Sequence, residues 1–127
     1  MSAGGFLAVG VGAMLGAWTR WGLGALLNAV LPSLPLGTLV ANLAGGFLIG
    51  VAVEFFFHHV LIAPEWRLFI ITGFLGSLTT FSTFSAEAVE LLATNQYGWA
   101  VLLIGSHLAG SLLMTVLGIY AARSLGL

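Results

Sequence analysis

The sequence predicts an all-α membrane protein with four transmembrane helices, the third of them broken at mid-membrane. Of the 127 residues, 60% are hydrophobic and only 6% are charged, whereas soluble domains carry about 25% charged residues. The apolar residues form four runs long enough to cross the hydrocarbon core of a bilayer, which takes about 20 residues. Only the third run is interrupted by a cluster of glycines and hydroxyl side chains.

Short connections rich in helix breakers separate the four runs. Pro32 and Pro35 lie between the first and second runs, Pro64 precedes the third, and Asn95 lies between the third and fourth. Proline and asparagine commonly end helices, and connections this short join antiparallel neighbours. We therefore expect residues 1–127 to form a single transmembrane domain. The predicted spans are residues 5–27, 36–57, 66–93 and 98–122.

The interruption of the third run, at residues 73–84, favours a local break in the helix. Glycine and a Leu-Thr-Thr run weaken the helix there, because β-branched threonine crowds the preceding turn. Unwound backbone at membrane depth must face protein or a water-filled cavity. Phe81 and Phe84 follow three residues apart, so both rings lie on one face of the resumed helix. This pattern predicts a pathway lined by the two rings.

Polar side chains within the spans are candidates for function because they are costly there. Asn42 follows Thr38 by four residues, so the two share a helix face, and its amide offers two N–H donors without a formal charge. Such donors suit an anion, although an interhelical hydrogen bond is the alternative. His107 and Ser111 are also four apart. A single histidine in such a place is more often a packing residue.

Small residues recur at a spacing of four in three runs, as in Gly12 and Gly16 or Gly46 and Gly50. Such stripes let helix backbones approach closely. For any single stripe, packing within one chain is at least as well supported as packing between chains. Together the stripes favour a compact oligomer.

Three arginines give the chain little charge asymmetry across a membrane. With the amino terminus in the cytoplasm, Arg67 and Arg123 fall on the inner side and Arg20 lies near the outer end of the first run. So weak a bias predicts insertion in both orientations, that is, dual topology. The alternative is that one arginine is buried or snorkels and does not count toward orientation.

Several classes of site lack the residues they need. Glu54, His58 and His59 resemble part of a metal site, with Glu54 and His58 one turn apart. Catalytic zinc takes three protein ligands, and no ligand from elsewhere in the chain is evident to join that pair. Cysteine is absent, and the net charge of −1 gives no basis for a nucleic-acid partner. No catalytic constellation appears, so we expect no enzyme.

Three motifs, at residues 73–84, 37–45 and 16–21, resemble those of the Fluc (CrcB-type) fluoride channels, and the resemblance spans the whole chain. It implies a multi-pass protein of the cell inner or plasma membrane that forms an antiparallel, dual-topology homodimer. Two pathways through that dimer would export fluoride passively from the cytoplasm. The resemblance also implies a structural sodium ion at the dimer centre.

Site residues follow from the same resemblance. The backbone carbonyls of Gly76 and Thr79 correspond to sodium ligands, and Arg20 corresponds to an arginine of the vestibule. His107 departs from the hydroxyl residue expected one turn before Ser111. The residues that correspond to the pore lining are Asn42, Phe81, Phe84, Ser82, Thr83, Thr38 and Ser111.

Two other classes of protein have this size and hydropathy. A small dual-topology multidrug/proton antiporter needs an ionisable carboxylate within the membrane, commonly in the first helix, and residues 5–27 contain none. A non-transporting assembly subunit would not need a broken helix lined with Phe and Thr.

Overall fold

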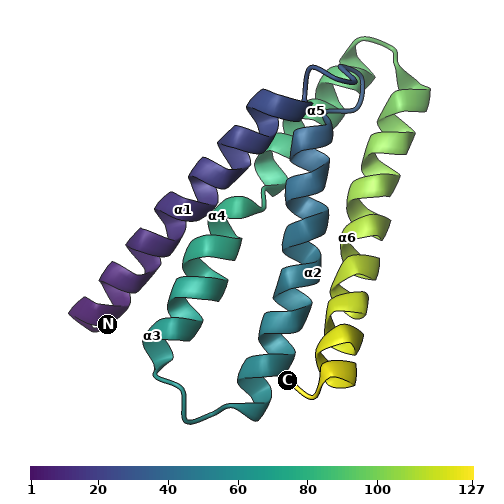
Figure 1. Cartoon of the computed structure of the whole chain (residues 1–127). Coiled ribbons are helices and arrows are strands. Elements are labelled where there is room, and N and C mark those ends of the chain that lie inside the picture. Colours follow the sequence, from purple (N-terminus) through teal and green to yellow (C-terminus); the bar gives the residue numbers. More distant parts are fainter.

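The computed structural model describes residues 1–127, and it is entirely helical. Figure 1 shows long helices lying side by side, with the N-terminus, the C-terminus and α3 at one end of the molecule. The predicted all-α fold is confirmed. The elements are α1 (Ala3–Leu27), α2 (Leu36–His58), α3 (Pro64–Arg67), the π-helix η1 (Leu68–Leu75), α4 (Gly76–Leu78), α5 (Phe81–Ala93) and α6 (Tyr97–Leu125).

Three segments are long and apolar enough to cross a membrane: Leu36–His58, Pro64–Ala93 and Tyr97–Leu125. They match the second, third and fourth predicted spans. Helix α1 is also long, with 25 residues, but seven glycines, two tryptophans and Arg20 lower its hydropathy. The first span, and with it the count of four, stays a prediction.

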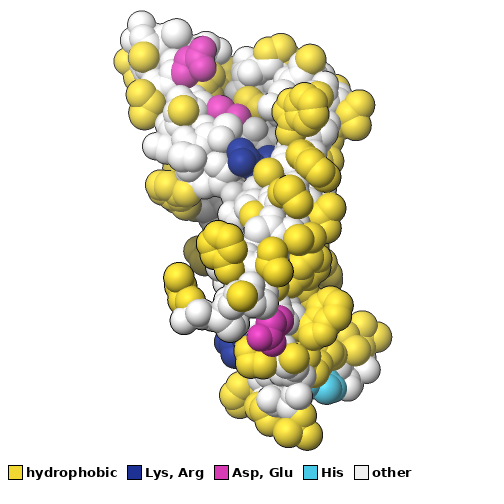
Figure 2. All heavy atoms as spheres, turned by 90° about the vertical axis from the view of Figure 1, so that its left-hand side faces the viewer, with side chains coloured by type: hydrophobic (Ala, Val, Ile, Leu, Met, Phe, Trp, Pro, Cys, Tyr) yellow, Lys and Arg dark blue, Asp and Glu magenta, His cyan; other side chains and the backbone are white.

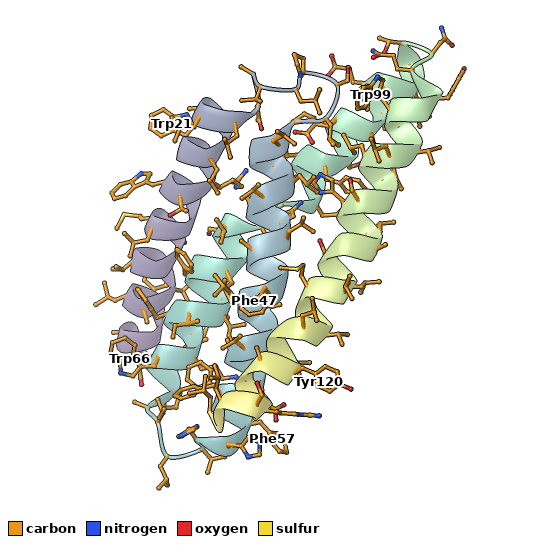
Figure 3. The ribbon with its side chains drawn as sticks, turned by 45° about the vertical axis from the view of Figure 1, so that its right-hand side comes forward. Trp21, Phe47, Phe57, Trp66, Trp99 and Tyr120 are labelled. Carbon is orange, nitrogen blue, oxygen red and sulfur yellow. The ribbon has the colours of Figure 1, made fainter.

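The surface of the chain is largely apolar. Figure 2 shows hydrophobic side chains over most of the face that carries α1, with few charged groups among them. On α1 alone, Phe6, Val11 and Trp18 are exposed. Figure 3 shows Trp21 and Trp99 at one end of the molecule, and Trp66 and Tyr120 at the other. Tryptophan and tyrosine are enriched at both interfaces of a bilayer, so this arrangement fits a protein that spans one.

Glycines set the close packing of the helices within the chain. A Cβ at Gly12 or Gly16 would fall against the backbone of η1 and α4, and one at Gly46 or Gly50 against that of α6. All of these neighbours belong to the same chain. The alternative of packing within one chain therefore holds for both stripes, and they no longer argue for association between chains.

Gly118→Ala is expected to destabilise the protein. A Cβ there would lie against the backbone carbonyl of Phe47 on α2, and overpacking a tight interface typically costs about 1–3 kcal/mol. The temperature of unfolding in detergent, followed by tryptophan fluorescence, should fall. Gly105→Ala on the same helix is the matched control, because a Cβ there meets nothing within 4 Å. Equal unfolding temperatures for the two variants would contradict the packing of α2 against α6.

The predicted break in the third segment is present. Thr79 (φ −84°, ψ 155°) and Thr80 (φ −152°, ψ 118°) are extended, and they separate α4 from α5. Figure 1 shows this break as a thin link in the middle of the molecule. The extended backbone positions the groups of the candidate site, because it interrupts the helical hydrogen bonds on both sides.

Candidate functional site

A cavity of about 440 Å³ lies beside the break, walled by α2, η1, α4, α5 and α6. No Asp, Glu, Lys or Arg lines it, so its polar groups are hydroxyls, amides and one imidazole. Seven residues singled out from the sequence come together here: Asn42, Gly76, Thr79, Phe81, Phe84, His107 and Ser111. They come from three segments of the chain, so the fold itself assembles the site.

Asn42 holds the break in place. Its Oδ1 accepts a hydrogen bond from the backbone N–H of Thr80 at 2.7 Å, and its Nδ2 donates to the carbonyl of Thr80 at 3.0 Å. The same Nδ2 lies 3.0 Å from Nδ1 of His107. The interhelical hydrogen bond that the sequence left open as an alternative is therefore present. It satisfies both backbone groups of an extended residue, which is what a polar group removed from water requires.

Two backbone carbonyls at the break lose their helical partners. In a continuous α-helix the N–H of Thr80 would bond the carbonyl of Gly76. Here that N–H donates to Oδ1 of Asn42 instead. The N–H of Thr83 would bond the carbonyl of Thr79, but it donates to Oγ1 of Thr80 at 3.1 Å. Both carbonyls therefore remain available as oxygen ligands, which suit a hard cation. These are the two residues that the resemblance assigns to a sodium site, so the residues present fit that ion.

Arg20 satisfies another carbonyl at the break. Its Nε donates to the carbonyl of Ser77 at 2.9 Å. The side chain lines a second cavity, of about 460 Å³, together with Asn28, Thr38 and Thr83. Arg20 thus combines a structural bond with a position on a polar cavity. A cation in a cleft raises the local concentration of anions.

The two phenylalanines lie next to each other after the break. Their ring centroids are 5.4 Å apart at an interplanar angle of 70°, an edge-to-face pair. Phe84 is buried, with 6% of its surface exposed, whereas Phe81 is 73% exposed. Both line the first cavity. The predicted common face is confirmed, and Phe81 projects from the single chain at the edge of the cavity.

His107 is a packed residue that also bears an unused polar atom. It is 3% exposed, and its ring stacks on Phe84 with centroids 4.8 Å apart. Its Nε2 is buried and has no hydrogen-bond partner in the chain. The imidazole replaces the hydroxyl that the resemblance led us to expect. The spacing of four from Ser111 was the one sequence signal that placed it at the site.

The hydroxyl residues divide between the two cavities. Ser111 lines the first, and Thr83 and Thr38 line the second. The hydroxyl of Thr38 donates to Oε1 of Glu87 at 2.7 Å. Ser82 lies on the exposed side of α5, with its hydroxyl 3.3 Å from that of Thr80. Three of the four predicted hydroxyl residues therefore line a cavity, and Ser82 lines neither.

Sequence reasoning missed Asn28, a residue that organises this region. Asn28 accepts from the backbone N–H groups of Gly37 and Thr38, at 2.8 and 3.2 Å, and so caps the start of α2. Thr38, whose backbone N–H is bonded by Asn28, also donates its hydroxyl to the carboxylate of Glu87. Only the capping preference of asparagine hinted at the role of Asn28.

Glu54 and its neighbours form a separate cluster near the other end of the bundle. Its carboxylate accepts from Nε and Nη2 of Arg123, at 2.9 and 3.2 Å, and lies 3.1 Å from Nε2 of His58. His59 instead contacts the carbonyl of Phe55. The partner of Glu54 is therefore an arginine on α6, which ties α2 to α6 at this end.

Comparison with known proteins decides the family. The family model described as CrcB-like protein, Camphor Resistance (CrcB), matches residues 7–119. This chain belongs to the CrcB family. Curated proteins that are similar to this chain include several named fluoride-specific ion channel FluC. The protein from Nitrosospira multiformis is 61% identical over 91% of this chain and 91% of its own length. The protein from Cupriavidus pinatubonensis is 60% identical over 95% of this chain and 96% of its own length. The one from Ralstonia pickettii is 61% identical over 98% of both chains.

Proposed function

We propose that this chain is a fluoride-selective ion channel that exports fluoride passively from the cytoplasm. The observation that carries the proposal is the identity of about 60% to proteins named fluoride-specific ion channel, over nearly the whole chain. The predicted landmarks of a pathway, Asn42, Phe81 and Phe84, also lie on one uncharged cavity. A channel is not an enzyme, and we assign no catalytic residue.

The chemistry of the cavity suits a small, strongly hydrated anion. Conduction requires groups that replace the hydration shell and still release the ion. Aromatic rings carry positive edges, so an anion passes favourably beside Phe81 and Phe84. Hydroxyl donors at Ser82, Thr83 and Ser111 would continue the path, and Thr38 would line it with its hydroxyl donated to Glu87. The sequence contains no lysine, so no fixed ammonium group traps the ion.

We further propose that the functional unit is an antiparallel, dual-topology homodimer of a single four-helix transmembrane domain. Phe81 is 73% exposed at the edge of an open cavity, where a second copy would complete the wall. Only three Lys or Arg residues are present, which leaves little to fix one orientation. Aromatic residues at both ends of the helices fit α1 as a fourth span in the inner or plasma membrane.

A structural sodium ion is part of the proposal. The carbonyls of Gly76 and Thr79, left without helical N–H partners, would hold it between two copies. Exchange of Na⁺ for N-methylglucamine should therefore lower the temperature of unfolding of the purified protein in detergent. Ligand at about 100 times its Kd stabilises by about 2.7 kcal/mol, so the unfolding temperature should keep rising with the logarithm of the Na⁺ concentration above Kd. An unfolding temperature that does not depend on the cation would contradict the site.

The antiporter alternative has less support. The curated relatives carry the name of an ion channel, and Ala3–Leu27 contains no Asp or Glu. The carboxylate of Glu54 is engaged by Arg123. A proton-coupled exchanger would have to free that group in each cycle.

Fluoride efflux from proteoliposomes tests the function. Vesicles loaded with potassium fluoride are diluted into fluoride-free buffer, valinomycin is added, and a fluoride electrode follows release. Purified protein should release fluoride within seconds, and vesicles loaded with chloride should show no comparable chloride release. Protein-free vesicles are the control. Equal release of the two halides, or release no faster than from protein-free vesicles, would refute a fluoride-selective channel.

A further inference from the structure

We propose that His107 is a positioning residue that fixes the orientation of the Phe84 ring at the cavity wall. The inference rests on the proposed anion pathway beside the phenylalanines. His107 is 97% buried, as its exposed fraction of 3% shows. One side of its ring is bonded to Asn42 at 3.0 Å, and one face is stacked on Phe84 at 4.8 Å with an interplanar angle of 25°.

The hydrogen bonds of Asn42 determine which nitrogen of His107 carries the proton. Because Oδ1 of Asn42 accepts from the Thr80 N–H, the atom that faces His107 is Nδ2, which can only donate. Its two hydrogens point to the Thr80 carbonyl and to Nδ1 of His107. Nδ1 is therefore an acceptor, and the ring is neutral with its proton on Nε2. This bond holds the imidazole plane against the fixed backbone of the break.

The fixed imidazole in turn restricts Phe84. The faces of an aromatic ring carry negative potential and the rim carries positive potential. His107 covers one face of Phe84, and only 6% of that residue remains accessible. Phe84 also meets Phe81 in an edge-to-face pair. Turning the ring to present its face to the cavity would break the stack. His107 thus keeps the anion-attracting rim at the pathway.

Neither glutamate of the second half of α5 makes a hydrogen bond to His107. On α5, the carboxylate of Glu87 bonds Thr38, and Glu90 lies nearly one turn further along the helix and is exposed. On α2, the neighbouring polar residue is the uncharged Asn42. The His107 ring is thus held by two uncharged partners, the Asn42 amide and the Phe84 ring.

A pair of substitutions separates the ring from its hydrogen bond. His107→Phe and His107→Leu both lose the acceptor for Asn42, but only Phe retains an aromatic ring over Phe84. In the fluoride efflux assay, His107→Leu should be slower than the wild type by about tenfold, and His107→Phe should recover to within about threefold, from the energy of an aromatic pair. Wild-type efflux from His107→Leu would overturn the proposal, as would equal loss in both variants. Absence of efflux from the wild type would instead refute the channel function.

The proton position can be measured on the wild-type protein itself. Nitrogen-15 NMR of the histidine-labelled wild type should show one ring with a protonated Nε2 and an unprotonated Nδ1. The spectrum of His107→Gln assigns that ring, because His58 and His59 remain. A proton on Nδ1 of His107 in the wild type would overturn the proposed arrangement whatever the efflux rates are.

Discussion

Phe81→Ile is expected to abolish fluoride efflux and to leave the protein folded. Phe81 is 73% exposed and is not among the buried hydrophobic residues that form the core of the chain, so a smaller apolar residue removes little packing. Isoleucine, however, has no aromatic rim to offer an anion. We expect efflux to fall by about 100-fold, equivalent to about 2.7 kcal/mol of the barrier. The fluoride electrode assay on matched amounts of reconstituted protein measures the change.

The chain offers a matched control for this substitution. Phe57 is also 73% exposed, but it lies at the far end of α2 and lines neither of the cavities described above. Phe57→Ile should keep wild-type efflux, and both variants should elute from a sizing column like the wild type. Normal efflux from Phe81→Ile would remove Phe81 from the pathway.

Asn42→Ala is expected to destabilise the protein and to stop efflux. The substitution leaves the N–H and carbonyl of Thr80, together with Nδ1 of His107, without their partner. Each buried polar group left unpaired costs about 1–3 kcal/mol, so for these three groups a total loss of about 3–9 kcal/mol is expected. The N–H of Thr80 would then be available to bond the carbonyl of Gly76 and close the break. Thermal unfolding in detergent and fluoride efflux are the two measurements.

Thr19→Ala is the control for loss of a polar group from a long helix. The Thr19 hydroxyl bonds only the carbonyl of Leu15 on its own helix, at an exposed position. Its removal should shift the unfolding temperature little and leave efflux unchanged. If Asn42→Ala behaved like Thr19→Ala, Asn42 would not be the residue that holds the break.

Local chemistry explains why the break and the paired rings were predictable. Glycine and β-branched threonine at 73–80 weaken a helix by their own backbone preferences, and a spacing of three places Phe81 and Phe84 on one face. The structure confirms both features. Both signals are local and could be read from the sequence, although the bonds of Asn42 on α2 hold the break in the folded chain.

The role of Asn42 could not be read in the same way. Two N–H donors on an uncharged amide are equally suited to an anion and to a backbone carbonyl. The structure gives both donors to protein groups, Thr80 and His107. Likewise, nothing in the sequence indicated that Arg20 meets the carbonyl of Ser77, or that the glycine stripes pack within one chain.

The sequence by itself determined that this is an apolar helical protein with an interrupted third segment, because hydropathy, breakers and helix period act over a few neighbouring residues. Only the tertiary structure decided which group each polar atom meets. The bonds of Asn42 to Thr80, of Arg20 to Ser77 and of Asn42 to His107 join residues 38, 57 and 65 positions apart. Such pairings depend on the tilt and register of whole helices, which close packing through small residues fixes.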